Sequence, residues 1–373
     1  MEFTVNKQDI VASLYKAQGV VDKKSTLNIL SHVLIESVSN TEVRFTCTDY
    51  DVVLTGTIRA EVNQPGKVAI GAKNFYEVVR ALPDEPIHLS RLENDWVELS
   101  CGSARFRLAG LPANDFPEQT DPDGLKFALL PKNLLADMVD RTLFSASHDE
   151  SRASLNGVYF DMERQGDEIR LLMVSTDGHR LSKSESIGGE ADQFNEPAKA
   201  IIHRKAISEL KRCLEGSSES VQVAFHRGNV YFAMDETMLQ VRELEEVFPD
   251  YSRVIPESNQ IQLKLNRMQF HDTVRRIATL TSSKTHILRF EIEPGKLILR
   301  SSNPEAGEGR DELPIEYAGE PLHVGFNYRY LLDVLSVIEN DVVTFSINDQ
   351  YSPGMITSPD DEGSLFVVMP MRI

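Results

Sequence analysis

The sequence predicts an α+β protein made of three homologous domains, and three observations support this prediction. A strand followed by a helix opens the chain at Phe3 and returns at Phe127 and Leu263, at intervals of 124 and 136 residues. A second strand–helix unit follows in each third of the chain. Short segments with alternating apolar and polar residues fill most other positions, and such alternation is typical of half-buried strands.

The opening unit shows the pattern. Phe3 and Val5 alternate with polar neighbours, as in a strand, and Asn6 is a residue type that caps helices. Apolar residues then recur at helical spacing, so one face of the helix is expected to pack on a sheet. These residues are Ile10, Leu14 and Ala17, with counterparts within 134–139 and 270–277.

The second unit recurs at a constant interval. Ile70 and Ile202 are 132 residues apart, and the same interval separates Phe116-Pro117 from Phe248-Pro249. This constant offset indicates repeated domains, the alternative being a generic α+β protein with accidental similarity. The strands of these units are expected at 68–70, 200–202 and 322–324, and their helices at 73–82, 204–214 and 327–338.

The remaining strands are separated by short turns, so the sheets are expected to be largely antiparallel. One strand is followed by Thr48-Asp49 in the first third, by Thr176-Asp177 in the second and by Ser302-Asn303 in the third. We expect domains at 1–124, 125–257 and 258–373, since Asp121–Gly124 is a turn sequence. The expected strands are 33–38, 43–48, 52–58, 96–99, 104–108, 158–162, 169–175, 221–225, 288–292, 297–301 and 342–347.

Composition and cysteine usage predict a cytoplasmic protein. The chain has 373 residues, too many for one ordinary core, and 41% of them are hydrophobic. No apolar run reaches membrane-spanning length, and the first residues do not form a signal peptide. Cys47, Cys101 and Cys213 form neither a disulfide framework nor a metal-binding pattern. We therefore expect no membrane association, no metal and no cofactor.

The net charge of −18 argues by itself against nucleic-acid binding, but the charge is distributed unevenly. The helices are expected within six windows: 6–24, 72–82, 131–142, 203–214, 266–284 and 327–338. These windows hold 17 basic and 8 acidic residues, a net charge of +9, so the remaining residues carry a net charge of −27. The alternative is that helix surfaces simply favour Lys and Arg. No window has aromatic residues interleaved for base stacking, so the expected contact is with phosphates, and lasting attachment would require encirclement.

Several motifs, in order along the chain, resemble those of the bacterial sliding clamps, the β subunits of DNA polymerase III. They are Leu155-Asn156-Gly157, Thr176–Leu181, Phe248–Tyr251, Arg253–Pro256, Ser302–Glu305 and Val367–Ile373. The resemblance implies three tandem copies of the DNA-clamp fold in a head-to-tail homodimer, with antiparallel sheets outside and two helices per domain lining a ring. Such a ring encircles duplex DNA without sequence specificity and tethers the polymerase. Implied partners are the polymerase III catalytic subunit, the clamp loader, and other polymerases and repair proteins.

The resemblance also implies a pocket for partner peptides between the second and third domains. Its apolar members would bury a Leu or Phe of the partner, and His179 and Arg180 would rim it with hydrogen-bond donors. Met369 and Met371 suit a surface that adapts to several partners. The implied residues are Leu155, Thr176, Gly178, His179, Arg180, Leu181, Pro249, Arg253, Val254, Val367, Met369, Pro370, Met371 and Arg372.

The remaining implied sites contact DNA or join the subunits. Ala153 and Ser154 stand where better-known members carry aromatic residues, so no ring contact is expected there. DNA contacts are expected at Lys24, Lys73, Arg80, Arg152, Arg204 and Lys205, with Arg275 and Arg276 proposed from spacing alone. The subunit joint is expected to pack Phe106 and Leu108 near Leu280 of the neighbouring chain, with Glu305 and Glu308 near Arg105 and Lys73.

A hydrolase or ligand-binding protein that uses the Thr176–Leu181 turn is the other class considered. Ser175, Asp177 and His179 lie within five residues, without a nucleophile elbow. A catalytic triad requires residues that approach one another across a fold, so His179 is better explained as part of the pocket rim or the turn.

Overall fold

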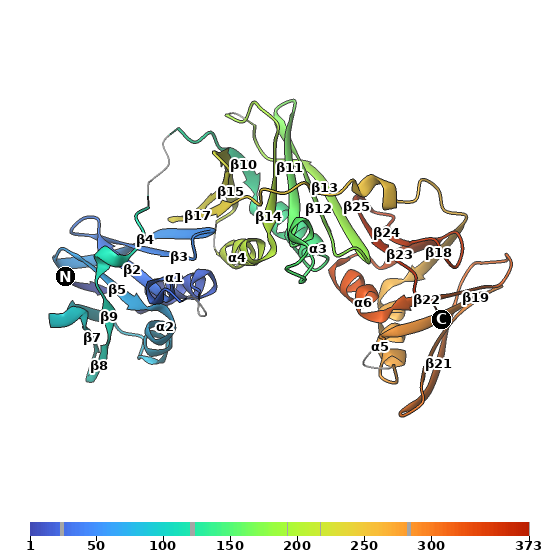
Figure 1. Cartoon of the computed structure of the whole chain (residues 1–373), viewed down its shortest axis with the longest axis horizontal. Coiled ribbons are helices and arrows are strands. Elements are labelled where there is room, and N and C mark those ends of the chain that lie inside the picture. The colour runs from blue at the N-terminus through green and yellow to red at the C-terminus, as the bar shows by residue number, and fades with distance from the viewer. Residues whose placement is uncertain (23–25, 120–123, 192, 217, 282–284, 373) are drawn as a thin grey trace.

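The computed structural model describes residues 1–22, 26–119, 124–191, 193–216, 218–281 and 285–372. They form a crescent, with the helices along its concave side and the strands mostly on its outer side (Figure 1). The described residues include two α-helices in each third of the chain, as expected, and the sheet ladders are antiparallel throughout these residues.

The first third begins with the expected strand and helix. Its strands are β1 (Glu2–Val5), β2 (His32–Ser37), β3 (Glu42–Thr48), β4 (Val52–Gln64), β5 (Lys67–Gly71), β6 (Ile87–Arg91), β7 (Val97–Cys101), β8 (Ala104–Leu108) and β9 (Gly110–Leu111). Its helices are α1 (Lys7–Val20) and α2 (Ala72–Ala81), with short 3-10 turns at Asn28–Ser31, Glu93–Asp95 and Ala113–Asp115.

The second third repeats this order. Its strands are β10 (Ala128–Pro131), β11 (Gly157–Gln165), β12 (Glu168–Thr176), β13 (Arg180–Gly188), β14 (Ala198–His203), β15 (Ser220–His226), β16 (Asn229–Met234) and β17 (Thr237–Arg242). Its helices are α3 (Lys132–Leu143) and α4 (Arg204–Leu214), with 3-10 turns at Ala153–Leu155 and Tyr251–Val254.

The last third contains the C-terminal strands. They are β18 (Ile261–Asn266), β19 (Ile287–Glu293), β20 (Lys296–Asn303), β21 (Gly307–Pro314), β22 (Leu322–Asn327), β23 (Val342–Ile347), β24 (Gly354–Ser358) and β25 (Asp361–Val368). Its helices are α5 (Arg267–Ala278) and α6 (Tyr328–Val337).

The helix starts follow from their capping residues. The side chain of Asn6 accepts a hydrogen bond from the Gln8 amide, which confirms the expected cap of α1. Asn266 and Asn327 cap α5 and α6 in the same way. Ile10, Leu14, Ala17 and Val20 are the buried residues of α1, so its apolar stripe faces the sheet as predicted.

The turn after the recurring strand is the same in all three thirds. In the first, Asp49 Oδ1 accepts hydrogen bonds from the amides of Asp51 (3.1 Å) and Val52 (2.8 Å). Asp177 Oδ1 accepts the two equivalent bonds, from the amides of His179 and Arg180, and Asn303 Oδ1 accepts the first of them, from the Glu305 amide. The repeat inferred from sequence therefore extends to individual hydrogen bonds.

Sheets continue from one domain into the next. At the first junction β17 pairs with β4, and at the second β25 pairs with β13. Within the described part of the chain, β8 pairs only with β7 and β21 only with β20. These two strands lie at opposite ends of the crescent (Figure 1), so each end presents a sheet edge.

The apolar core is distributed unequally between the junctions. One continuous cluster of buried residues extends through the first two domains and includes Cys47 and Cys213. The third domain has its own cluster, which includes Phe270, Phe290 and Phe345. The second junction therefore depends more on strand pairing and polar contacts than the first.

Candidate functional site

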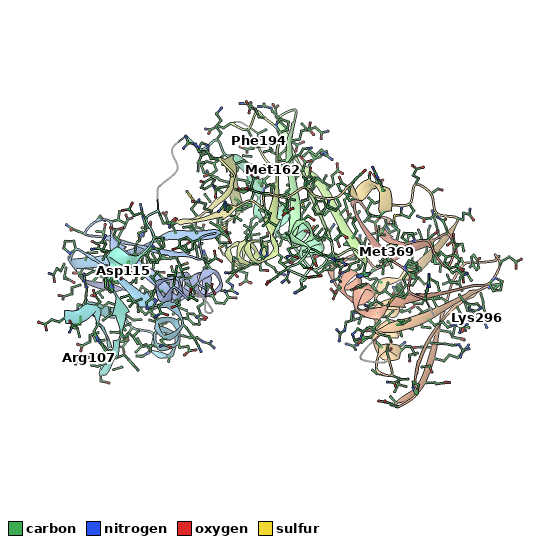
Figure 2. All side chains as sticks on the ribbon, in the orientation of Figure 1. Arg107, Asp115, Met162, Phe194, Lys296 and Met369 are labelled. Carbon is green, nitrogen blue, oxygen red and sulfur yellow. The ribbon has the colours of Figure 1, made fainter. Side chains whose placement is uncertain are left out.

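The C-terminal segment crosses the junction between the second and third domains. Beyond the β13–β25 ladder, the Met369 amide donates to the carbonyl oxygen of His179 at 2.8 Å, and the Met371 amide donates to that of Gly325 at 2.8 Å. Figure 2 shows Met369 where the middle and right-hand parts of the crescent meet. The terminus is thus built into the region expected to hold the peptide pocket.

The apolar centre of this region is formed by two of the expected residues. Leu181 and Val367 lie opposite each other on paired strands and are 2% and 1% exposed. They belong to a small cluster with Leu172 and Val174, against which Tyr251 and other residues pack. The resemblance to the sliding clamps implied both residues, and the strand pairing brings them together; their contact with a partner peptide stays a prediction.

An aromatic stack beside this cluster was missed. The ring centroids of Tyr159 and Phe248 are 5.3 Å apart, and those of Tyr159 and Tyr251 are 6.4 Å apart. The three rings and Pro249 line an open cavity of about 630 Å³. Burial, and then the nearby charge of Asp161, raise the pKa of Tyr159. The motif Phe248–Tyr251 was the available sequence signal.

The Thr176–Arg180 turn lies under a basic side chain. Gly178 has φ of +87°, a left-handed conformation that glycine adopts without strain. Arg152 Nη1 lies 3.3 Å from the Asp177 carbonyl oxygen and 3.1 Å from the position that a Cβ on residue 178 would occupy. Arg152 therefore borders the expected peptide pocket, and its contact with DNA stays a prediction.

Arg180 differs from the expectation of a rim donor. Its guanidinium group is 10% exposed and donates to Asp177 at 3.0 Å, to Asp333 at 2.5 Å and to the Phe144 carbonyl oxygen. It also lies over the rings of Phe144 and Tyr330, at 5.3 and 4.5 Å from their centroids. These contacts engage the group within the domain junction, because Asp333 and Tyr330 belong to the third domain. Its role as a rim donor to a partner peptide stays a prediction.

The other expected pocket residues vary in exposure. Arg253 is 81% exposed by side chain and pairs with Asp250 at 2.8 Å, and Val254 is 42% exposed. Gly178, His179, Pro249 and Arg372 are exposed, whereas Leu155, Thr176, Met369, Pro370 and Met371 are half-buried.

A catalytic triad is not formed at this turn. Ser175 is fully buried, and its hydroxyl donates to the Thr142 carbonyl oxygen. The Asp177 carboxylate accepts from two backbone amides and from Arg180, while His179 is exposed. Among the described residues, no group of three or more His, Cys, Asp or Glu side chains is arranged to hold a metal ion. No helix in the described ranges is long and apolar enough to span a membrane.

The concave face carries only some of its expected bases in an available form. Lys73 and Arg80 are exposed on α2, and the Arg275 side chain on α5 is 70% exposed. Arg276 instead donates twice to Asp311, at 3.0 and 2.7 Å. Lys24 lies outside the described residues.

Two further expected DNA contacts lie at domain junctions. Lys205 forms an ion pair with Asp49 and donates to the Val20 carbonyl oxygen at 3.1 Å, which joins the second domain to the first. Arg204 contacts His148 Nε2 at 2.7 Å, and burial lowers the pKa of Arg204. The contact of Lys205 with DNA stays a prediction, and it would require the amine to release the Asp49 carboxylate and the Val20 carbonyl oxygen.

The two ends of the crescent contain the residues expected at the subunit joint. Arg105 and Phe106 are exposed on β8, Phe106 by 40%, and Leu108 is half-buried. Figure 2 places Arg107, on the same strand, at one end of the crescent. At the other end, Glu305 and Glu308 are exposed and Leu280 is half-buried. The ends thus combine apolar surface with opposite charges.

A crescent with helices inside, sheets outside and an open strand edge at each end has the architecture of a clamp, a class of ring proteins that enclose DNA. The family models for the N-terminal, central and C-terminal domains of the DNA polymerase III beta subunit match residues 1–120, 129–250 and 252–372.

Known proteins of this kind are similar over their full lengths. The beta sliding clamp of Caulobacter vibrioides is 35% identical, and that of Pseudomonas aeruginosa 32%, with 100% of each chain covered. The solved sliding clamp of Bartonella birtlesii bound to griselimycin has a TM-score of 0.92 at 32% identity, with 100% of both chains covered. The DNA polymerase III beta subunit of Thermotoga maritima has a TM-score of 0.91 at 29% identity, covering 100% of this chain and 99% of that one.

The chain therefore belongs to the DNA polymerase III beta subunit family, the beta sliding clamps. It is a non-catalytic processivity clamp of DNA replication, which acts on DNA in the cell interior. Its partners are duplex DNA, DNA polymerase III and a second copy of itself. The expected α+β fold of three clamp domains is confirmed.

Proposed function

We propose that β8 of one subunit pairs with β21 of the next, so that two chains close head to tail around duplex DNA. The observation that carries this proposal is which strands pair at the two internal domain junctions and which strands are left with an unpaired edge. In the repeat, β13 and β21 are the counterparts of β4, and β17 and β25 are the counterparts of β8. Each internal junction pairs one strand of each kind, β4 with β17 and β13 with β25. The strands left over, β21 and β8, are the third pair of the same kind, and joining them removes both exposed edges.

The internal junctions also define the register of this pair. Leu239 of β17 lies opposite Leu54 of β4, and Phe366 of β25 lies opposite Ser182 of β13. Phe106 corresponds to Leu239, because each lies two residues beyond the closing pair of its hairpin. Leu54 lies opposite Cys47, and Gly309 lies opposite Ser301. Cys47 and Ser301 directly precede the equivalent residues Thr48 and Ser302, so Gly309 corresponds to Leu54. By this correspondence, Phe106 would lie opposite Gly309 of the partner subunit.

The surroundings of Gly309 suit this arrangement. A Cβ built on Gly309 would lie 2.9 Å from Ser301 Oγ, 3.4 Å from Ile277 Cδ1 and 3.8 Å from Leu280 Cδ1. Because residue 309 has no side chain, the ring of Phe106 can lie over Ile277 and Leu280, in keeping with the expected Phe106–Leu280 contact. The same register places Arg107 opposite the partner's Glu308, which pairs opposite charges at an exposed position.

We further propose that duplex DNA passes along the concave face. Lys73, Arg80 and Arg275 are exposed there and can contact phosphates, with Arg152 and Arg204 nearer the second junction. The exposure of Lys73, Arg80, Arg152 and Arg275 and the positive charge of all five bases support contacts that are independent of base sequence and weaken with salt. The residues outside the six helix windows carry a net charge of −27, which disfavours DNA binding elsewhere on the chain.

Partner peptides are proposed to bind at the second junction. A Leu or Phe side chain buried beside Leu181 and Val367 would contribute roughly 1.5–3 kcal/mol. Movement of the segment that carries Tyr251 and Val254 would provide access, since it packs over these two residues. Griselimycin bound to the Bartonella clamp supports a ligand site in this family.

The domain limits and the location also stay proposals. The matched ranges 1–120, 129–250 and 252–372 support domains at 1–124, 125–257 and 258–373. Three free, buried cysteines and the replication role support a cytoplasmic location.

The encirclement proposal is tested by topology. The clamp is loaded on nicked circular DNA with its clamp loader, the circle is cut at one site, and the bound fraction is measured by gel filtration. We expect retention on the circle and loss after cutting, because a closed ring slides off a free end. Equal retention on the intact and the cut circle would contradict encirclement. The control is a circle with a protein bound on each side of the cutting site, because these proteins block both ends after the cut and should keep the clamp on the DNA.

A further inference from the structure

The concave side contains an open cavity of about 540 Å³, and Arg80, an expected DNA contact, is the only one of its lining residues that belongs to a site named above. It lies where α1, α2 and α4 meet, at the junction of the first two domains (Figure 1). Its volume is within the range of about 300–1,000 Å³ typical of ligand pockets. The cavity is lined by Tyr15, Gln18, Gly19, Val21, Asp22, Tyr76, Arg80 and Arg212.

Two tyrosine rings meet in this cavity although they come from different helices. The ring centroids of Tyr15 and Tyr76 are 6.5 Å apart, with an interplanar angle of 40°. Tyr15 is 40% exposed and lies off the buried stripe of α1, so its ring is presented to solvent on the concave side. Tyr15 lies on α1 and Tyr76 on α2, so the spacing of residues within one helix does not reveal the pair. For this reason the sequence indicated no aromatic surface on which bases could stack.

Arg212 holds the Tyr15 ring from the other domain. Its guanidinium carbon lies 5.1 Å from the Tyr15 ring centroid, and its Nη1 donates to the Tyr15 carbonyl oxygen at 3.3 Å. A third contact, between its Nε and Glu209, measures 3.7 Å. Because three contacts fix this planar cation against the ring, the aromatic surface is ordered before any ligand arrives.

We propose that this cavity binds an unpaired nucleobase of single-stranded DNA, stacked on Tyr15 and Tyr76. Planar aromatic and guanidinium groups stack on bases of any sequence, and Arg80 and Arg212 supply positive charge for the adjoining phosphates. Bases within a duplex already stack on one another, so only an unpaired strand can use the rings. The inference rests on the proposed passage of DNA along the concave face, since a clamp that serves a polymerase meets partly single-stranded DNA.

The test compares three fluorescent probes by anisotropy at low salt: a 20-nucleotide oligothymidine strand, an abasic strand of the same length and a 20-base-pair duplex. The unmodified protein is expected to bind oligothymidine more tightly than the abasic strand, which has the same phosphates but no bases. Tyr15→Leu should lower oligothymidine affinity at least about fivefold, the lower limit for loss of one base–aromatic stack. It should also remove the difference between the two single strands.

Control variants separate stacking from other effects. Tyr15→Phe keeps the ring and should bind oligothymidine as the unmodified protein does. Tyr351→Leu removes a tyrosine that is 76% exposed and does not line this cavity, and it should change no affinity. Tyr76→Leu provides a second variant should Tyr15→Leu unfold, and circular dichroism checks the fold of each.

Several results would overturn the proposal. They are equal affinity of the unmodified protein for oligothymidine and the abasic strand, unchanged oligothymidine affinity in Tyr15→Leu, and an equal loss for the duplex, which would indicate a contact with the DNA backbone only. The retention experiment on circular DNA separates this inference from the clamp proposal. A clamp that is retained on the circle but shows no base preference contradicts only the stacking site.

Discussion

Arg180 shows how a single side chain joins two domains. Its guanidinium group bonds Asp177 in its own domain and Asp333 in the next, between two aromatic rings. A flat, rigid donor fits this site, and lysine would not, because an ammonium group has no planar face and fewer fixed donors. Among the described residues, only a small apolar cluster joins the second and third domains, whereas one large core extends through the first two, so these contacts matter more at the second junction.

Arg180→Ala is therefore expected to loosen the second junction. Removing a largely buried guanidinium leaves the carboxylates of Asp177 and Asp333 without their cation. The free energy of unfolding should fall by about 2 kcal/mol, less than for a fully buried pair because Asp333 is partly exposed. Hydrogen exchange measured by mass spectrometry should show faster exchange in β25 and in residues 369–371.

The matched control for this prediction is Arg253→Ala. The Arg253 side chain is 81% exposed and is paired with Asp250 on the same 3-10 turn. Exchange in β25 should be unchanged in this variant. Arg180→Lys should lie closer to Arg180→Ala than to the unmodified protein, and unchanged exchange in both Arg180 variants would show that strand pairing alone holds the junction.

At the scale of elements, the subunit joint is defined by the register of β8 and β21. Arg105 precedes Phe106, and Arg310 follows Gly309, so the proposed register places Arg105 opposite Arg310 of the partner subunit. Directly opposed residues in antiparallel strands have Cβ atoms about 4.5–5.5 Å apart, close enough for a disulfide after slight adjustment. This arrangement can be detected chemically.

Arg105→Cys combined with Arg310→Cys is expected to form covalent dimers under mild oxidation. A non-reducing gel should show a species of twice the chain mass that disappears on reduction. The combination of Arg105→Cys with Glu312→Cys is the control, because Glu312 lies two residues farther along the same strand. Equal cross-linking of both pairs would contradict the register, and the three native cysteines are buried and should not interfere.

At the scale of the whole molecule, the charge of the inner surface is smaller than the composition of the helices suggests. Several helix bases are neutralised by pairs within the chain: Arg141 with Asp137 and Asp361, Lys211 with Asp140, Lys205 with Asp49, and Arg276 with Asp311. Weak, exposed phosphate contacts are compatible with sliding, because tight binding at fixed points would hold the ring in place. Ring closure, and not affinity, then accounts for lasting attachment.

The molecule is accordingly expected to be a dimer at micromolar concentration. Light scattering should give twice the chain mass, and Phe106→Asp should give the mass of one chain because it places a charge in an apolar contact. Ile187→Asp alters an apolar residue of similar exposure, 49%, on the middle domain and should remain dimeric. A monomeric unmodified protein would contradict the proposed joint.

Much of the fold could be predicted from the sequence, because its signals are local. The cap at Asn6, the alternation around Phe3 and the turn at Thr176-Asp177 depend on neighbouring residues, and each recurs along the chain. Comparison of the repeats then indicated three domains. Leu181 and Val367 were instead expected at the second junction from the resemblance to the sliding clamps, and the pairing of β13 with β25 brings them together.

Only the tertiary structure decided which side chains are available. Arg180 and Lys205 look like exposed bases in the sequence, but carboxylates from other domains engage both of them. Tyr15 and Arg212 are 197 residues apart, and no local pattern brings them together with Tyr76. The repeated elements follow from short-range spacing, whereas the junctions and the stacking cavity follow from how the domains pack, because packing sets distances between residues that the sequence leaves unrelated.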